Sequence, residues 1–264
     1  MKHKKFAFTL IELLVVIAII ALLLAIIVPS LKRAKEHALF LVCKSNLKAY
    51  GVAMITYLSE NDDLFTRSYA GVYSGTITST CQWHDKTLSP WYDSDNAGPL
   101  WPYLEEPKIH LCPTFINVAK NTHLPCPSNI PFDPQFSYSQ NNFLGWDSGV
   151  LKSADVRDPG STLVFVEETM WTIPDLATHI LNDTCFMSRH PKDPFGMVGD
   201  CIATYHNTPA SEVRKNEGSG NGIYLDGHVD LNKPERIEVN GMYFGTSYIL
   251  IWPKLGTYSS TCPY

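Results

Sequence analysis

Hydrophobic residues are concentrated at the start of the chain. They dominate from residue 6 to residue 28, and the sixteen positions 13–28 carry no polar side chain at all. A helix needs roughly 20 apolar residues to cross the hydrocarbon core of a bilayer, so this run predicts one membrane-spanning helix. Thr9 and Glu12 are the only polar side chains within it. A buried core helix does not need such uniform apolarity, and a cleaved secretory signal would end in a small-residue cleavage site that is lacking here.

An amphipathic stretch follows the apolar run. Pro29 is predicted to kink or interrupt the helix, because proline removes a backbone donor and clashes with the preceding turn. Helical periodicity then resumes as far as residue 58, with charged residues largely off the apolar faces. The two apolar stripes are Leu31, Ala34, Ala38, Val42, Ala49, Ala53 and Tyr57, and Leu47, Tyr50, Met54 and Leu58. As one helix, the 52 residues 8–59 would span roughly 78 Å, and the second half is expected to dock on a sheet.

Beyond residue 64 the pattern changes to short apolar runs separated by Gly- and Pro-punctuated loops. The run 163–167 follows a Pro-Gly turn and predicts a central strand. Asp226-Gly227 predicts a β-hairpin over 222–231 with a tight type I′ turn. Further strands are predicted at 237–239 and 248–252, and surface loops at 86–107, 121–137 and 183–222. The expected fold class is therefore α+β, with a long N-terminal helix packed on a small antiparallel β-sheet head with long loops.

Charge is distributed unevenly along the chain. Residues 1–58 hold eight Lys/Arg and two Glu, a net +6, whereas residues 59–264 hold thirteen Lys/Arg and twenty-four Asp/Glu, a net −11. Binding to nucleic acid rests on basic side chains that neutralise phosphates, so the acidic outer part argues against a nucleic-acid partner. The length of 264 residues suits one membrane element and one globular domain of roughly 200 residues.

Glu12 requires an explanation, because an ionised side chain within an apolar span is costly unless it finds a partner. The segment Ala7-Phe8-Thr9-Leu10-Ile11-Glu12, after a short basic lead, resembles the processing site of type IV prepilins and pseudopilins. The resemblance implies cleavage after Ala7 and N-methylation of the new terminus on Phe8. It also implies that the Glu12 carboxylate pairs with the terminal amine of a neighbouring subunit during assembly. The family usually has Gly where this chain has Ala7, which predicts slower cleavage.

A second set of residues extends the resemblance over most of the chain. The stalk motif Cys43-x-x-Asn46-Leu47-Lys48 is similar to that of a subgroup of pseudopilin-like proteins abundant in planctomycetes. The later matches are Leu100-Trp101-Pro102-Tyr103-Leu104, Leu111-Cys112-Pro113, Ser137-Tyr138, Asn141-Asn142, Asp158-Pro159-Gly160-Ser161-Thr162 and Asp226-Gly227-His228-Val229. The subgroup often has a His closer to the Asp-Gly pair than His206, which lies twenty residues before Asp226. Either a loop insertion separates the two or that His is missing.

The resemblance implies a division of the chain and a location for it. Residues 1–7 would be a cytoplasmic leader peptide, 8–28 the transmembrane half of the helix, 29–63 its amphipathic stalk half, and 64–264 an extracytoplasmic globular head. The chain would cross the inner (cytoplasmic) membrane once, with its head in the periplasm or outside. Its partners would be prepilin peptidase, sister pilin or pseudopilin subunits, the inner-membrane assembly platform and membrane lipid.

The implied function is that of a structural subunit, not of an enzyme. The chain would be a pseudopilin of a type II secretion-like filament, or alternatively a pilin or minor pilin whose head binds a surface or ligand. A simple membrane-anchored binding domain or hydrolase is less favoured, because Ser161 lacks the Gly-x-Ser-x-Gly elbow and the adjacent Glu167 and Glu168 should point to opposite faces of a strand. The candidates for a binding tip are Trp83, Trp91, Trp101, Trp146 and Trp171.

Seven cysteines predict an oxidising compartment. Proximity in sequence favours the pairs Cys112–Cys126 and Cys185–Cys201, whereas Cys43–Cys112 would join stalk to sheet, and the sequence leaves these alternatives open. The odd count leaves at least one thiol free or intermolecular. Zinc is the competing use of cysteine, and it is disfavoured because the chain contains no close Cys-x-x-Cys pair.

Two groups of residues have the composition of a metal site. Asp93-Ser94-Asp95-Asn96-Ala97-Gly98 alternates oxygen ligands before a Gly, as calcium loops do, but no bidentate Glu follows, so a solvated turn competes. A structural calcium ion on Asp93 and Asp95 is the one cofactor that the sequence suggests. The second group is His206, Asp226 and His228, with His190 and Asp200 nearby in sequence, and a partly exposed strand residue is the competing interpretation of His228.

Overall fold

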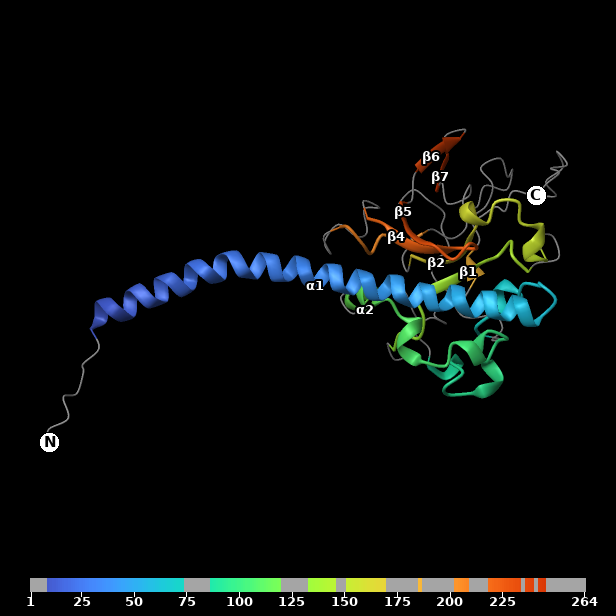
Figure 1. The fold of residues 1–264 in the computed structure, drawn as a ribbon, viewed down its shortest axis with the longest axis horizontal. Helices are drawn as coiled ribbons and strands as arrows, with labels where there is room; N and C mark the ends of the chain where they lie inside the picture. Colours follow the sequence, from blue (N-terminus) through green and yellow to red (C-terminus); the bar gives the residue numbers. More distant parts are fainter. Residues whose placement is uncertain are drawn as a thin grey trace.

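A long helix carrying a small head is the shape of the protein (Figure 1). The computed structural model describes residues 9–73, 86–119, 133–145, 151–169, 185–186, 202–208, 218–233, 236–239 and 242–245. Helix α1 (Leu10–Glu60) is one continuous helix of 51 residues, and its first half projects away from everything else that is described.

Pro29 lies inside α1 without ending it, so of the two predicted effects the interruption is wrong and the kink stays a prediction. The Ser30 hydroxyl shares its one proton between the carbonyl oxygens of Ile26 at 3.3 Å and Ile27 at 2.9 Å, which adds a hydrogen bond to the turn that proline weakens. Figure 1 shows α1 as a gently curved helix rather than a broken one. The helix therefore runs unbroken from the apolar half into the head.

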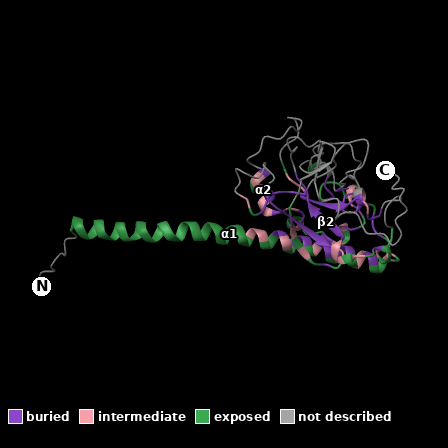
Figure 2. Ribbon diagram, turned by 90° about the horizontal axis from the view of Figure 1, so that it is seen from above, coloured by how far each residue is buried: buried purple, intermediate pink, exposed green. Residues whose placement is uncertain are grey.

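The two halves of α1 differ in what covers them, as Figure 2 shows. Residues 9–38 are all exposed, and the first buried side chain is that of Cys43. The stripe formed by Leu47, Tyr50, Met54 and Leu58 is buried as predicted. In the other stripe Leu31 and Val42 are 65% and 45% exposed whereas Ala53 is buried, because the head covers only the C-terminal part of the helix.

The head is built on a five-stranded sheet with the strand order β3-β1-β2-β4-β5. The strands are β1 (Tyr138–Asn141), β2 (Leu163–Glu167), β3 (Cys185–Phe186), β4 (Gly220–Tyr224) and β5 (Val229–Asn232). Neighbours pair antiparallel except β1 and β3, which run parallel. The α+β class is confirmed, and the short edge strand β3 makes the sheet mixed rather than wholly antiparallel.

Smaller elements complete the described part of the head. Strands β6 (Arg236–Val239) and β7 (Met242–Gly245) form a separate two-stranded antiparallel sheet. Helix α2 (Pro113–Ala119) is short. Single 3₁₀ turns are found at Ser68–Ala70, Lys86–Leu88, Ser94–Asn96, Trp101–Tyr103, Pro107–His110, Ser153–Asp155 and Pro159–Ser161.

The main core lies between the second half of α1 and one face of the sheet. Tyr50 is buried there and packs edge-on against Tyr138 of β1 and Phe165 of β2, with ring centroids 5.3 and 5.0 Å apart. A Cβ built at Gly51 would overlap the Ile223 side chain, so the glycine allows α1 to approach β4 closely. Helix and sheet therefore share one continuous hydrophobic core.

The strand predictions are mostly confirmed. Residues 163–167 form β2, residues 237–239 lie in β6, and the predicted hairpin is β4–β5. Its turn is not type I′, because that turn needs positive φ at both central residues and in the Asp226-Gly227 pair only Gly227 has it, at 89°. The predicted strand 248–252 lies outside the described residues. Strand β1 was not predicted, because its sequence Tyr-Ser-Gln-Asn is polar yet wholly buried.

Candidate functional site

The first candidate site is the start of α1, where Thr9 and Glu12 bond to each other. The Glu12 N–H donates to the Thr9 hydroxyl at 3.2 Å, and the Glu12 carboxylate accepts from the Thr9 N–H and hydroxyl, each at 2.8 Å. This reciprocal pair is a capping box, and it holds the carboxylate at the N-terminal end of the helix. Ala7 and Phe8 lie outside the described residues, so cleavage and methylation stay predictions.

The side chains of the apolar half of α1 are exposed on every face of the helix. Large hydrophobic residues are exposed at both ends of this half: the exposed fraction is 79% at Leu10 and 60% at Val28. By length and composition α1 is able to cross a membrane, and no described residue of its most apolar 18-residue window is buried inside the protein. A soluble surface rarely carries an apolar patch of this size, so this half requires lipid or other helices around it.

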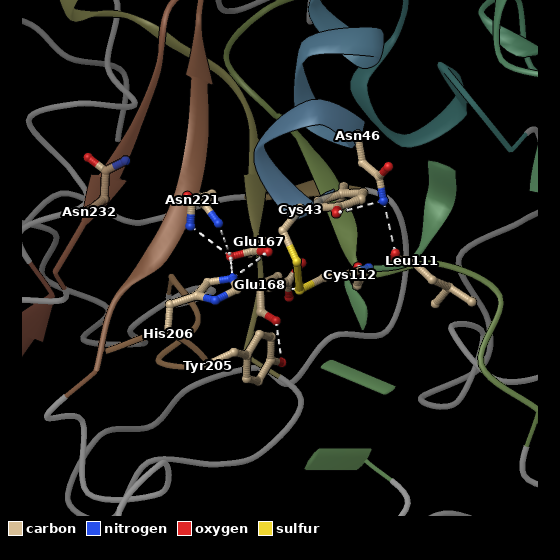
Figure 3. A network of polar contacts seen from close by, with 12 residues as sticks. Cys43, Asn46, Leu111, Cys112, Glu167, Glu168, Tyr205, His206, Asn221 and Asn232 are labelled. Atoms are coloured by element: carbon tan, nitrogen blue, oxygen red, sulfur yellow. Dashed lines mark hydrogen bonds and ion pairs between the residues drawn. A yellow bond between two sulfur atoms is a disulfide. The ribbon is translucent and has the colours of Figure 1, made fainter. Parts of the chain in front are cut away.

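The second candidate site lies where α1 meets the sheet (Figure 3). A disulfide joins Cys43 of α1 to Cys112, just before α2, with Cα atoms 4.9 Å apart. The pairing Cys112–Cys126 is therefore wrong, because Cys112 already has a partner that is near in space and distant in sequence. Cys126 and Cys201 lie outside the described residues, so the pairing of Cys185 with Cys201 stays a prediction.

A buried carboxylate and a buried imidazole lie next to this disulfide. Glu167 of β2 is fully buried and His206 is 4% exposed. The His206 Nε2 atom is 3.1 and 3.0 Å from the two carboxylate oxygens of Glu167 and 3.6 Å from the Cys112 Sγ. The backbone N–H of Asn221 in β4 donates to Glu167 at 2.7 Å. Four potential metal ligands, from Cys43, Cys112, Glu167 and His206, thus lie within 4.8 Å of one another.

His206 lies beside the sheet, next to the start of β4. The backbones of His206 and Ser219 bond to each other in both directions, at 2.9 and 2.8 Å, just before β4 begins. The two sequence alternatives for the distance between His206 and Asp226, a loop insertion or a missing His, both stay predictions.

Three residues of the stalk motif bind the head. Asn46 donates through its side-chain amide to the carbonyl oxygen of Leu111 at 3.0 Å. The Lys48 ammonium donates to the carbonyl oxygen of Gly227 in the hairpin turn. Together with the Cys43 disulfide, these contacts show that the motif joins the helix to the sheet.

The residues that the structure describes include parts of two other predicted sites. Asp93 accepts a hydrogen bond from the N–H of Asp95 at 3.1 Å and caps an exposed 3₁₀ turn, and a calcium ion there stays a prediction. Asp226 and His228 bond to each other at 2.6 Å at the exposed tip of the β4–β5 hairpin. His206 instead lies at the opposite end of β4, so these three residues do not form one site. His190 and Asp200 lie outside the described residues.

His110 is a buried titratable group in the same core. Its Nε2 lies 2.7 Å from the carbonyl oxygen of Leu104, so Nε2 carries the proton and Nδ1 accepts from the Tyr50 hydroxyl at 2.6 Å. Burial lowers the pKa of His110 to about 4. The neutral imidazole is thus built into the packing between α1 and the head.

Acidification is expected to destabilise the head through His110. The unfolded chain binds a proton near the ordinary histidine pKa of about 6.5, whereas the folded chain binds it only near pH 4. The free energy of unfolding should therefore fall by about 3 kcal/mol between pH 6.5 and pH 4 from this group alone. Denaturant unfolding of the detergent-solubilised chain at both pH values, with His110→Gln as the comparison, measures it. An equal pH dependence in the variant would contradict the assignment.

A long helix that is apolar at one end and packed on a small sheet at the other is the architecture of a pilin-like subunit. The comparison with protein families agrees, since residues 2–28 match the prokaryotic N-terminal methylation motif. The matched region holds the predicted processing site and the apolar run, and it supports a type IV pilin-like protein. No curated protein and no solved structure matches the chain.

Proposed function

We propose that the chain is a structural subunit of a filament of the type II secretion or type IV pilus kind. In this proposal prepilin peptidase removes residues 1–7, and the mature chain polymerises through α1. The observation that carries the proposal is the exposed apolar half of α1, which lies within the matched methylation motif and is continuous with a helix packed on the head. Among the described residues nothing packs on this half of the helix, so it is available to pack with the same helix of neighbouring subunits.

Glu12 favours a filament over a simple anchor. Within an isolated membrane helix its carboxylate has only the Thr9 cap as a described partner. A carboxylate near the bilayer centre costs about 3 kcal/mol, and pairing with the terminal amine of a neighbouring Phe8 would neutralise both charges. The exposed cluster Lys32, Arg33 and Lys35 would lie beyond the apolar half, where it can meet lipid headgroups.

The pseudopilin role is preferred to that of an adhesive pilin. The stalk motif, which resembles that of the pseudopilin-like subgroup, makes contacts between helix and head. Among the tryptophans proposed for a binding tip, Trp91 and Trp101 are described, and they pack on each other with centroids 4.5 Å apart and on His110 at 5.0 and 5.2 Å. Both rings therefore take part in internal packing, and Trp91 is also 39% exposed. Trp83, Trp146 and Trp171 lie outside the described residues.

The intact mass and N-terminal sequence of the membrane-extracted chain test the proposal. The chain would be expressed in matched hosts with and without prepilin peptidase. With the peptidase present, we expect a mature chain that begins at methylated Phe8. The variant Ala7→Gly is the matched control, because it restores the usual family residue and should be cleaved at least as fast. If both chains still begin at Met1 in the presence of the peptidase, the filament role is wrong and a simple anchored domain remains.

A further inference from the structure

The residues around the Cys43–Cys112 disulfide have the composition of a metal site that the filament role does not require. They come from four separate segments of the chain: α1, the loop before α2, strand β2 and the segment that pairs beside β4. In Figure 3 the two sulfur atoms, the Glu167 carboxylate and the His206 ring face one another. We propose that the dithiol form of this site, with Cys43 and Cys112 reduced, binds one zinc ion through Cys43, Cys112, His206 and Glu167.

The ligand atoms lie close to the spacing that a tetrahedral ion needs. Zinc binds thiolate sulfur at about 2.3 Å and nitrogen or oxygen at about 2.0–2.2 Å, so neighbouring ligand atoms should lie roughly 3.3–3.8 Å apart. The Cys112 Sγ and His206 Nε2 atoms are 3.6 Å apart, within this range, whereas His206 Nε2 and the Glu167 oxygens are 3.0–3.1 Å apart, as hydrogen-bonded partners are. All four ligand atoms lie within 4.8 Å of one another, so binding an ion requires that the disulfide opens and that the side chains adjust slightly.

The donor atoms select zinc over the other common ions. Two thiolates and an imidazole are borderline-soft ligands that suit zinc, whereas calcium and magnesium take oxygen ligands. The four residues are buried, with exposed fractions of 0–4%. Four protein ligands in a closed site are typical of structural zinc, which needs no open position for a substrate.

Charge supports the same conclusion. Two thiolates and the Glu167 carboxylate would place three negative charges in a site that excludes water, and burying charge without a partner is strongly unfavourable. A divalent cation offsets two of these charges. Glu167 is also held in place by the Asn221 N–H, which is the kind of outer contact that orients metal ligands.

The disulfide and the metal site use the same two sulfur atoms, so they exclude each other. The chain is synthesised with thiols, and the zinc form would precede oxidation. It would also return if a dithiol reductant gives the disulfide two electrons and two protons and is itself oxidised to a disulfide. Each thiol then releases its proton to solvent as its sulfur binds the ion. In both states a covalent or metal cross-link joins α1 to the sheet.

Zinc titration of the full chain in detergent tests the proposal. The chain is reduced with a phosphine, which becomes the phosphine oxide, and zinc is added in competition with a chromophoric chelator. Because the chain has seven cysteines, the informative quantity is the difference between wild type and Cys43→Ser/Cys112→Ser. We expect the double variant to lose one tight equivalent of zinc and His206→Gln to bind that equivalent at least about tenfold more weakly. The matched control Cys185→Ser, a buried cysteine on β3, should retain it.

Cysteine alkylation of the wild-type chain gives a second test that needs no variant. Mass spectrometry follows the Cys43, Cys112 and Cys185 peptides separately in the reduced chain, with and without zinc. Zinc should slow alkylation of Cys43 and Cys112 together and leave Cys185 unchanged. Equal alkylation of Cys43 and Cys112 with and without zinc would overturn the proposal, as would equal zinc binding by the wild type and the double variant.

Discussion

A chain carrying Glu12→Ala is expected to be cleaved after Ala7 but to fall by about tenfold or more in its incorporation into filaments. The peptidase site itself is left intact by this substitution. Assembly should fail because the amine of the incoming Phe8 loses its carboxylate partner, and an unpaired charge within lipid costs about 3 kcal/mol. The measurement is the fraction of mature subunit recovered in sheared filaments, set against the total in the membrane.

The capping box allows the charge of Glu12 to be separated from its hydrogen bond. Gln at this position can still bond back to the Thr9 N–H, whereas it cannot pair with an amine as a counter-ion. Glu12→Gln should therefore fail to assemble like Glu12→Ala, and Thr9→Ala, which removes the hydroxyl cap but retains the carboxylate, should assemble. If Glu12→Gln assembles normally and Glu12→Ala does not, helix capping and not charge pairing is the role of Glu12.

Removal of the Cys43–Cys112 disulfide is expected to lower the free energy of unfolding of the head by about 4 kcal/mol. The bond joins two cysteines with a sequence separation of 69, and a cross-link over such a length strongly lowers the conformational entropy of the unfolded chain. For a domain of this size the loss corresponds to a melting temperature about 10 °C lower. Thermal unfolding of Cys43→Ser/Cys112→Ser in detergent, with a metal chelator present, measures it.

The single variants are the control for the disulfide. If the two sulfur atoms are bonded, Cys43→Ser or Cys112→Ser alone breaks the cross-link completely, and each single variant should lose as much stability as the double variant. Small and additive losses would contradict the disulfide. Zinc should then raise the stability of the reduced wild type but not of these variants, which connects this measurement to the proposed metal site.

Some features of this protein follow from short-range sequence pattern. In lipid every backbone polar group must be satisfied within the segment, so the apolar run 13–28 has to form a helix. The helical periodicity after Pro29 identified the stripe from Leu47 to Leu58 that packs on the sheet. The run 163–167 and the Asp226-Gly227 turn identified β2 and the β4–β5 hairpin, because strands and turns are specified by neighbouring residues.

Tertiary structure decided what depends on partners distant in the sequence. Pattern alone did not distinguish the two apolar stripes of α1, since burial depends on how far the head extends along the helix. Strand β1 has no apolar alternation, and its polar side chains, such as Gln140 bonded to Thr66, are satisfied in large part by other segments.

The cluster at the junction of helix and sheet shows the same limit most clearly. Cys43 and Cys112 are 69 positions apart in the sequence, and the sequence left Cys43 and Cys126 as alternative partners of Cys112. The sequence grouped His206 with Asp226 and His228, yet its pairing with Ser219 places it against Glu167. The sequence by itself determined the apolar helix and the local strands, because their causes lie within a few residues. Only the folded chain determined which cysteine, histidine and carboxylate meet, because that depends on the packing of α1 across the sheet.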